Sequence, residues 1–253
     1  MTSRLISRFD NGRTPLRREV TEEIKRYILD SRLRPGDPLP TENELCAALG
    51  ASRSSIREAV KTLAALDIVE VRHGHGTYVG RLSLSALVEG LTFRGLLSPA
   101  DDFRVLSELV DVRELVERGM ADRIIASLRP EHLERLDGTV AEMEQGLREG
   151  LDVIAVDRRF HALLLEPLPN ELLGQLSSAC WDVHEIVAPH LSMVSVQDQA
   201  DTVAAHRAMV AALHSGDAAA FARAVHAHYA PVRRRLAAAR AGGAVPAPAS
   251  HER

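Results

Sequence analysis

Four side chains that can bind a metal ion interrupt the apolar faces of predicted helices in the second half of this sequence. They are Asp157, His161, His206 and His228, and they come from three helical segments. Buried polar groups need partners, and one shared divalent cation would satisfy all four at once. Asp157 and His161 are four residues apart, so a single helix could supply two ligands. Ordinary hydrogen bonds are the alternative, because a chain with 11 histidines places some of them on apolar faces by chance.

One carboxylate and three imidazoles suit a borderline transition ion, and we expect zinc or nickel. With open coordination positions such an ion could also activate a water molecule, as in metal-dependent hydrolases. The sequence identifies no general base dedicated to that reaction. We therefore predict that the chain is not an enzyme.

Arg113 is a further polar residue on an apolar stripe, where leucines and valines surround it. A buried guanidinium needs an anion. Its partner could be an internal carboxylate such as Glu117, or the carboxylate of a small ligand held by two parallel hydrogen bonds. We predict that Arg113 faces an effector acid beside the metal. His184 and His190 are weaker candidates for lining the same cavity.

A second group of polar residues begins a helix after the turn Gly50-Ala51-Ser52, and so short a turn between helices is typical of a helix-turn-helix. In such a unit the first residues of the second helix contact base edges in the major groove. Those residues here are Ser52, Arg53, Ser54, Ser55 and Arg57. Arg53 and Arg57 project from one face and suit the O6 and N7 atoms of guanine. The alternative is a solvated surface on which Arg57 pairs with Glu58 or Lys61.

Three helices and a β-hairpin must position these N-terminal residues. The predicted helices are residues 16–31, 41–49 and 52–66, and the predicted strands are residues 68–71 and 77–79. Thr41 and Glu44 form a capping box at the start of the second helix. We therefore expect a winged helix-turn-helix over residues 15–79, after a flexible arm at residues 1–14.

The remainder of the chain shows helical periodicity and no convincing strand, which predicts an all-α bundle and a mainly α fold class. The predicted helices are residues 86–97, 101–127, 130–148, 151–165, 170–194, 199–214 and 217–240. We expect a linker at residues 80–85, an all-α effector-binding domain at residues 86–240 and a disordered tail at residues 241–253.

Composition narrows the class of protein further. Of the 253 residues 45% are hydrophobic and 26% are charged, as in an ordinary globular protein. The formal net charge is −4, yet residues 1–80 carry 13 Lys and Arg against 11 Asp and Glu. A slightly basic head on an acidic body fits a DNA-binding module joined to another domain. Cys46 and Cys180 lack a metal-binding spacing, and no signal peptide or membrane span is evident, so we expect a cytoplasmic protein.

Three motifs near the N-terminus are PGDPLPTENEL at residues 35–45, SRSSIREAV at residues 52–60 and GHGTYV at residues 74–79. Together they resemble the winged helix-turn-helix of GntR-type regulators. The resemblance implies that Arg53 and Arg57 read bases. It also implies that His73 and Gly74, at the wing tip, approach the minor groove or phosphates. Many members carry Arg where this chain has Asn43, which could still donate a hydrogen bond there.

Four further motifs are RELVE at residues 113–117, DRRFH at residues 157–161, AHRAMVAALHSGD at residues 205–217 and AVHAHY at residues 224–229. They are similar to the FCD effector domain of the FadR subgroup. Many members of that subgroup bind a divalent metal through one Asp and three His. The matching positions here are Asp157, His161, His206 and His228. His226 is the alternative for the last ligand, but it lies two residues away and faces elsewhere.

The same resemblance implies small organic acids as effectors, including sugar acids and hydroxy- or dicarboxylates. We therefore predict a sequence-specific transcriptional regulator, a repressor released when such an acid binds at the metal. Its expected partners are a pseudo-palindromic operator in double-stranded DNA and a second copy of the chain, because two reading heads meet half-sites about one helical turn apart. The alternatives are a regulator for which the metal itself is the signal, and a metal-dependent hydrolase.

Overall fold

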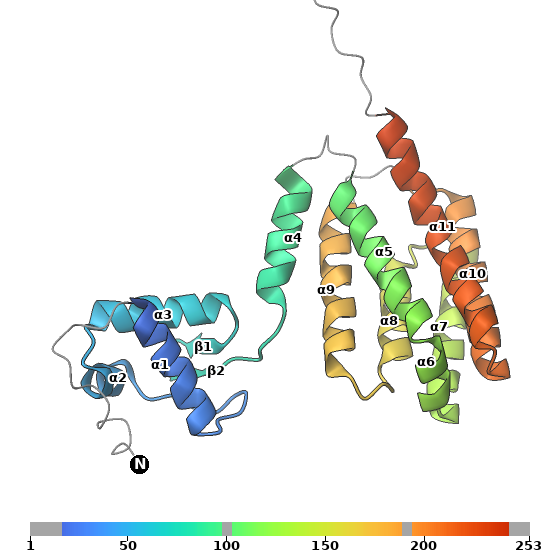
Figure 1. The fold of residues 1–253 in the computed structure, drawn as a ribbon. Helices are drawn as coiled ribbons and strands as arrows, with labels where there is room; N and C mark the ends of the chain where they lie inside the picture. Colours follow the sequence, from blue (N-terminus) through green and yellow to red (C-terminus); the bar gives the residue numbers. More distant parts are fainter. Residues whose placement is uncertain (1–16, 98–102, 189–193, 243–253) are drawn as a thin grey trace, which may run out of the picture. The chain divides into compact units, whose positions relative to one another are not determined.

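The chain divides into two compact units, residues 1–86 and residues 87–253, each described here by itself. The computed structural model describes residues 17–97, 103–188 and 194–242 (Figure 1). The predicted arm at residues 1–14 and most of the predicted tail at residues 241–253 lie outside them. The described segments hold eleven helices and one two-stranded antiparallel sheet, which confirms the mainly α fold class. None of these helices is both long and apolar enough to cross a membrane.

The first unit contains three helices and a hairpin. They are α1 (Arg17–Asp30), α2 (Glu42–Leu49), α3 (Arg53–Ala65), β1 (Val69–Arg72) and β2 (Gly76–Val79). The predicted capping box at the start of α2 is confirmed, because the Thr41 side chain accepts from Glu44 N and the Glu44 carboxylate accepts from Thr41 N. Gly50 ends α2 with a φ of 59°, a conformation that glycine adopts at little cost. Ile24 of α1 and Ile56 of α3 share one buried apolar core, which fixes the second helix of the turn.

The wing is the antiparallel pair β1 and β2, with Val69 opposite Val79 and Arg72 opposite Gly76. Its tip needs positive φ at Gly74, where φ is 77°, and at Gly76, where φ is 107°. The Leu39 amide donates to the Thr77 carbonyl at 2.8 Å, so the loop before α2 ties the wing to the helices.

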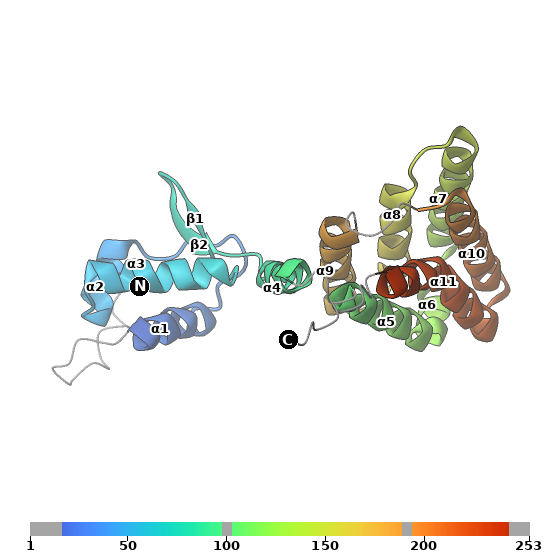
Figure 2. The ribbon, with the colours of Figure 1, turned by 90° about the horizontal axis from the view of Figure 1, so that it is seen from above.

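The second unit is a bundle of helices. They are α4 (Ser85–Leu97), α5 (Arg104–Gly119), α6 (Ala121–Ser127), α7 (Pro130–Glu149), α8 (Ile154–Leu165), α9 (Glu171–Val187), α10 (Val196–Ser215) and α11 (Ala218–Gly242). Helix α11 packs along α10 and against α5, as the view in Figure 2 shows, and α8 contacts both α7 and α9. Leu106, Phe160 and Phe221 are among the residues of their common core.

Several helix boundaries differ from the sequence prediction. Helix α8 begins at Ile154 and not at residue 151, and the Asp152 carboxylate accepts from Ile154 N at 2.9 Å. Helix α9 is Glu171–Val187, whereas the prediction ran to residue 194, and α11 runs to Gly242, two residues into the predicted tail.

The prediction of a single helix over residues 101–127 is wrong, because α5 and α6 are separate helices that meet at Met120. The break follows Gly119, and glycine is a poor helix former. Helix α10 begins at Val196 and not at residue 199, because the Ser195 hydroxyl caps it by accepting from Asp198 N at 3.0 Å.

Candidate functional site

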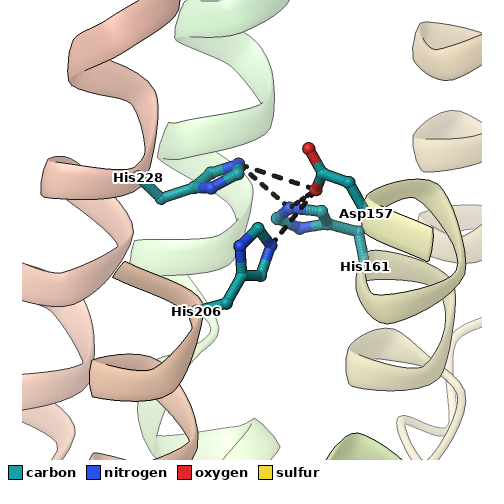
Figure 3. A group of neighbouring side chains, drawn as sticks. All are labelled: Asp157, His161, His206 and His228. Atoms are coloured by element: carbon teal, nitrogen blue, oxygen red, sulfur yellow. Dashed lines mark hydrogen bonds and ion pairs between the residues drawn. The ribbon is translucent and has the colours of Figure 1, made fainter. Parts of the chain in front are cut away.

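The four predicted metal ligands lie together inside the second unit. Asp157 and His161 are one turn apart on α8, His206 is on α10 and His228 is on α11 (Figure 3). One ligand atom from each residue can be chosen so that all four atoms lie within 4.8 Å of one another. The three histidines are buried and the Asp157 side chain is 14% exposed. The packing of three helices therefore brings together residues up to 71 positions apart in the sequence.

The short contacts show which atoms face the centre of this cluster. Asp157 Oδ1 is 3.1 Å from His161 Nε2, 3.1 Å from His206 Nε2 and 4.0 Å from His228 Nε2. His161 Nε2 and His228 Nε2 are 3.1 Å apart. The Nε2 atom of each ring thus points toward one carboxylate oxygen, and all four donors converge (Figure 3).

Two of the rings have a partner behind them at Nδ1: a hydrogen bond holds His206, and a close carboxylate, without normal hydrogen-bond geometry, faces His161. His206 Nδ1 donates to the Thr202 carbonyl at 2.8 Å, which leaves the Nε2 lone pair facing the cluster. His161 Nδ1 lies 2.7 Å from Oε1 of the buried Glu117. Such partners behind a ring are typical of metal-binding histidines.

Buried atoms of the cluster that lack a hydrogen bond show whether a cation would fit there. Asp157 Oδ1 and His206 Nε2 are buried, and within the described segments neither makes a hydrogen bond of normal geometry. The oxygen and nitrogen donors suit a divalent ion such as zinc. Hydrogen bonds alone, the alternative interpretation of the sequence, leave these two atoms unpaired.

The ionisation of Asp157 and His228 suits a cation, whereas His161 would have to release a proton to bind one. Burial by itself would raise the pKa of Asp157, but the neighbouring His206, His228 and His161 hold it well below its usual range. Burial, together with the neighbouring His206, lowers the pKa of His228 well below its usual value. Burial opposes the charge of His161, yet the negative Glu117 beside it leaves its pKa raised. An anionic carboxylate and a neutral imidazole are the forms that bind metals.

A cavity opens beside the cluster and is lined by both Asp157 and His228. Polar side chains from several helices also line it, namely Arg113, His184, Gln199, Thr202 and Arg235. Burial and the nearby Arg113 lower the pKa of His184 to about 4, so this histidine is neutral at pH 7. His184 thus lines the cavity, whereas His190 lies outside the described residues.

Arg113 of α5 is 7% exposed and lies over two aromatic rings. Its guanidinium carbon is 4.1 Å from the centre of the Trp181 ring and 5.3 Å from that of Tyr229. Its Nε and Nη2 atoms are buried without a hydrogen-bond partner among the residues that the structure describes. Burial opposes its charge, but Tyr229, Glu117 and Asp157 leave the pKa of Arg113 above its usual value. Glu117, the internal carboxylate considered as its partner, contacts His161 and Tyr229.

His226 does not join the cluster. Its Nδ1 atom lies 2.8 Å from Oε1 of Glu114, and its side chain is 65% exposed. The nearby His228 faces the opposite way, toward Asp157, because two positions along a helix turn a side chain by more than half of a circle.

In the first unit, the predicted DNA-contacting residues lie at the start of α3 and on the wing, except Asn43, which is on α2. The exposed ones are Asn43, Ser52, Arg53, Ser54, Arg57, His73 and Gly74, while Ser55 is half-buried. The Ser52 hydroxyl caps α3 and lies 2.9 Å from the hydroxyls of Ser54 and Ser55. The three serines therefore form a local cap, and the two arginines carry the charge at this end of the helix.

Arg57 has a partner that the sequence did not reveal. Its Nε atom donates to Oε2 of Glu42 on α2 at 2.9 Å, whereas Lys61 pairs with Glu58. The bond uses only the Nε edge of the guanidinium. The Arg57 side chain is 63% exposed, so its two Nη groups can still bind a guanine or a phosphate.

We expect Glu42→Gln to lower the affinity for a specific DNA site by about 1.4- to 5-fold per half-site, because an exposed ion pair that orients a side chain contributes about 0.2–1 kcal/mol. Fluorescence anisotropy with the selected site measures this. Glu58→Gln is the control, since it likewise removes one negative charge, but from α3, where the Glu58 carboxylate accepts from Lys61. A gain in affinity would show that Glu42 only repels the phosphates.

Comparison with known proteins identifies both parts of the chain. Residues 16–79 match the family model "Bacterial regulatory proteins, gntR family", and residues 108–231 match the model "FCD domain". The chain is similar to the HTH-type transcriptional regulator LutR of Bacillus subtilis, with 32% identity over 59% of this chain and 66% of LutR. It is also similar to the Galactonate operon transcriptional repressor of Escherichia coli, with 28% identity over 62% of this chain and 68% of the repressor. It thus spans about two thirds of the length of these relatives.

A solved structure gives the same result for the fold. The Streptococcus agalactiae GntR structure matches with a TM-score of 0.64 and 27% identity, over 87% of this chain and 99% of that one. The matched models and relatives indicate a transcription regulator and not an enzyme, which confirms the sequence prediction and excludes the hydrolase alternative. The chain is therefore a DNA-binding transcriptional regulator that belongs to the GntR family and carries an FCD domain after its winged helix-turn-helix.

Proposed function

We propose that this regulator is a repressor that leaves its operator when a small organic acid binds at a metal site in the second unit. The observation that carries the proposal is the buried guanidinium of Arg113, which has no anionic partner within the described segments and faces the same cavity as Asp157 and His228. A buried cation without an anion is costly, so a ligand carboxylate is the group that completes this site.

Asp157, His161, His206 and His228 would hold the metal, with zinc or nickel as the ions that this donor set suits. When bound, the ion supplies a positive charge for one oxygen of the acid. Arg113 would hold the carboxylate with two parallel hydrogen bonds. Thr202 lines the same cavity, and its hydroxyl donates to the Asp198 carbonyl at 2.8 Å, so it can accept a hydrogen bond from a hydroxyl group of the acid. One relative is named for an operon of galactonate, a sugar acid, which agrees with this class of ligand.

The output of the proposed switch is DNA affinity. Residues 15–79 would read the operator through Arg53 and Arg57 in the major groove, with His73 and Gly74 of the wing beside it. Ser52, Ser54, Ser55 and Asn43 would contact phosphates or bases at the same end. We infer a homodimer in the cytoplasm that meets a pseudo-palindromic site, so a small displacement of the two heads is enough to lower affinity.

The test is a DNA-binding titration. An operator is first selected from random-sequence DNA, and its affinity is measured with Zn²⁺ alone and with Zn²⁺ plus a sugar acid, a 2-hydroxy acid or a dicarboxylate. We expect at least one acid to lower the affinity. If Zn²⁺ alone changes the affinity and no acid does, the metal is the signal. If the protein selects no sequence at all, the proposed function is wrong.

Arg113→Met should separate acid sensing from DNA binding. We expect this variant to keep its operator affinity in the absence of acid and to need about 10- to 100-fold more acid for release, because a hydrogen-bonded charge contributes about 1.5–3 kcal/mol. The matched control is Arg118→Met, which removes a half-exposed guanidinium from the same helix. An unchanged acid response in Arg113→Met would exclude Arg113 from the effector site.

A further inference from the structure

The sequence motif RELVE places two carboxylates on α5, and only one of them reaches the metal cluster. Glu117 is 2% exposed, and its Oε1 atom lies 2.7 Å from His161 Nδ1. The same oxygen accepts a hydrogen bond from the hydroxyl of Tyr229 at 3.0 Å. Glu117 is not one of the four converging ligands and does not line the cavity.

We propose that Glu117 is a positioning residue of the metal centre, and that Tyr229 connects it to the acid-binding side of the cavity. This inference rests on the metal centre proposed above. A carboxylate behind a histidine keeps the proton on Nδ1, so the lone pair of Nε2 stays directed at the ion. His161 Nε2 is the atom that faces Asp157 Oδ1 at 3.1 Å, as this arrangement requires.

The charge of Glu117 distinguishes His161 from the other oriented ligand. His206 is held by the neutral carbonyl of Thr202, which fixes the ring but adds no charge. A carboxylate in the same role also makes the imidazole a stronger donor to the metal. Removing the charge while keeping the shape should therefore weaken metal binding without releasing the helix.

Tyr229 provides the connection toward the ligand. Its hydroxyl binds Glu117, its side chain lines the cavity, and the guanidinium of Arg113 lies 5.3 Å from its ring centre. Both Tyr229 and Glu117 are almost completely buried, so neither can turn away without opening the core. Glu117, Tyr229 and Arg113 thus form a continuous series of contacts from His161 to the guanidinium.

The second carboxylate of the motif offers a matched control. Glu114 is on the same helix and is 5% exposed, but it binds Arg118, His226 and Arg233 and does not contact the cluster. Glu117→Gln and Glu114→Gln therefore make the same chemical change at two buried sites three residues apart.

The experiment measures the Zn²⁺ affinity of the full chain by competition with a chromophoric chelator. We expect Glu117→Gln to lower the affinity by about 10- to 100-fold, Tyr229→Phe to lower it less, and Glu114→Gln to leave it within about twofold. Circular dichroism of each metal-free protein checks the fold. Nitrogen-15 NMR of the metal-free chain should show His161 protonated at Nδ1, and this signal should change in Glu117→Gln.

Two results would overturn the inference. One is a Glu117→Gln protein that is folded and binds Zn²⁺ as the wild type does. The other is an equal loss in Glu114→Gln, which would mean that any buried charge on α5 matters. If Glu117→Gln does not fold, Tyr229→Phe decides, because it removes only the hydroxyl that supports Glu117. A wild-type chain that binds no Zn²⁺ contradicts the proposed metal centre itself, which is a different failure.

Discussion

Zn²⁺ is expected to raise the melting temperature of the second unit by about 5–10 °C, and Asp157→Asn is expected to abolish this rise. An ion at 100 times its Kd stabilises the folded state by about 2.7 kcal/mol. For a unit of this size, 1 kcal/mol shifts the melting temperature by about 2–4 °C. Asp157 Oδ1 is close to Nε2 of all three histidines, so its loss removes the centre of the cluster. Differential scanning calorimetry with Zn²⁺ and with a chelator measures both states.

His214→Gln is the control for this experiment. His214 is half-exposed on α10, and its Nε2 atom lies 2.9 Å from Oδ2 of Asp137. Neither residue is one of the proposed metal ligands. We expect His214→Gln to keep the whole Zn²⁺-dependent shift. A full shift in Asp157→Asn would show that the ion binds somewhere else, for example at exposed histidines.

The second large effect is expected at the start of α3. Arg53→Ala or Arg57→Ala should lower the affinity for the selected operator by about 30- to 20,000-fold. Each guanine contact contributes about 1–3 kcal/mol of discrimination, and a dimer on two half-sites loses it twice. Electrophoretic mobility shift with operator and random DNA measures the loss on each.

Comparing the loss of affinity for operator DNA with that for random DNA shows whether an arginine contacts bases or phosphates. Base readers lose operator affinity and keep most of their affinity for random DNA, because phosphate contacts carry no sequence information. Arg26→Ala on α1 is the control, since Arg26 is also exposed and paired with a glutamate. An equal loss on both DNAs would mean that Arg53 and Arg57 contact phosphates and do not read bases.

The sequence predicted the ends of a helix correctly where the interactions that fix them lie within a few residues, as in α2. The capping box of Thr41 and Glu44 involves residues three apart, and the structure has both of its hydrogen bonds. Gly50 ends α2 because glycine adopts its left-handed φ of 59° without strain. The boundary at Met120 was missed because the apolar periodicity of α5 continues into α6, so the pattern contained no proline or charge run to mark it.

The sequence by itself determined which residues could do chemistry, since helical periodicity placed Asp157, His161, His206 and His228 on inner faces. Only the tertiary structure decided their partners. Glu117 was considered for Arg113, four residues away, yet the packing of α5 turns it toward His161 and Tyr229. Arg57 likewise pairs with Glu42 on another helix, 15 residues away. Periodicity states which face of a helix a side chain occupies, whereas the partner on that face depends on how the helices pack.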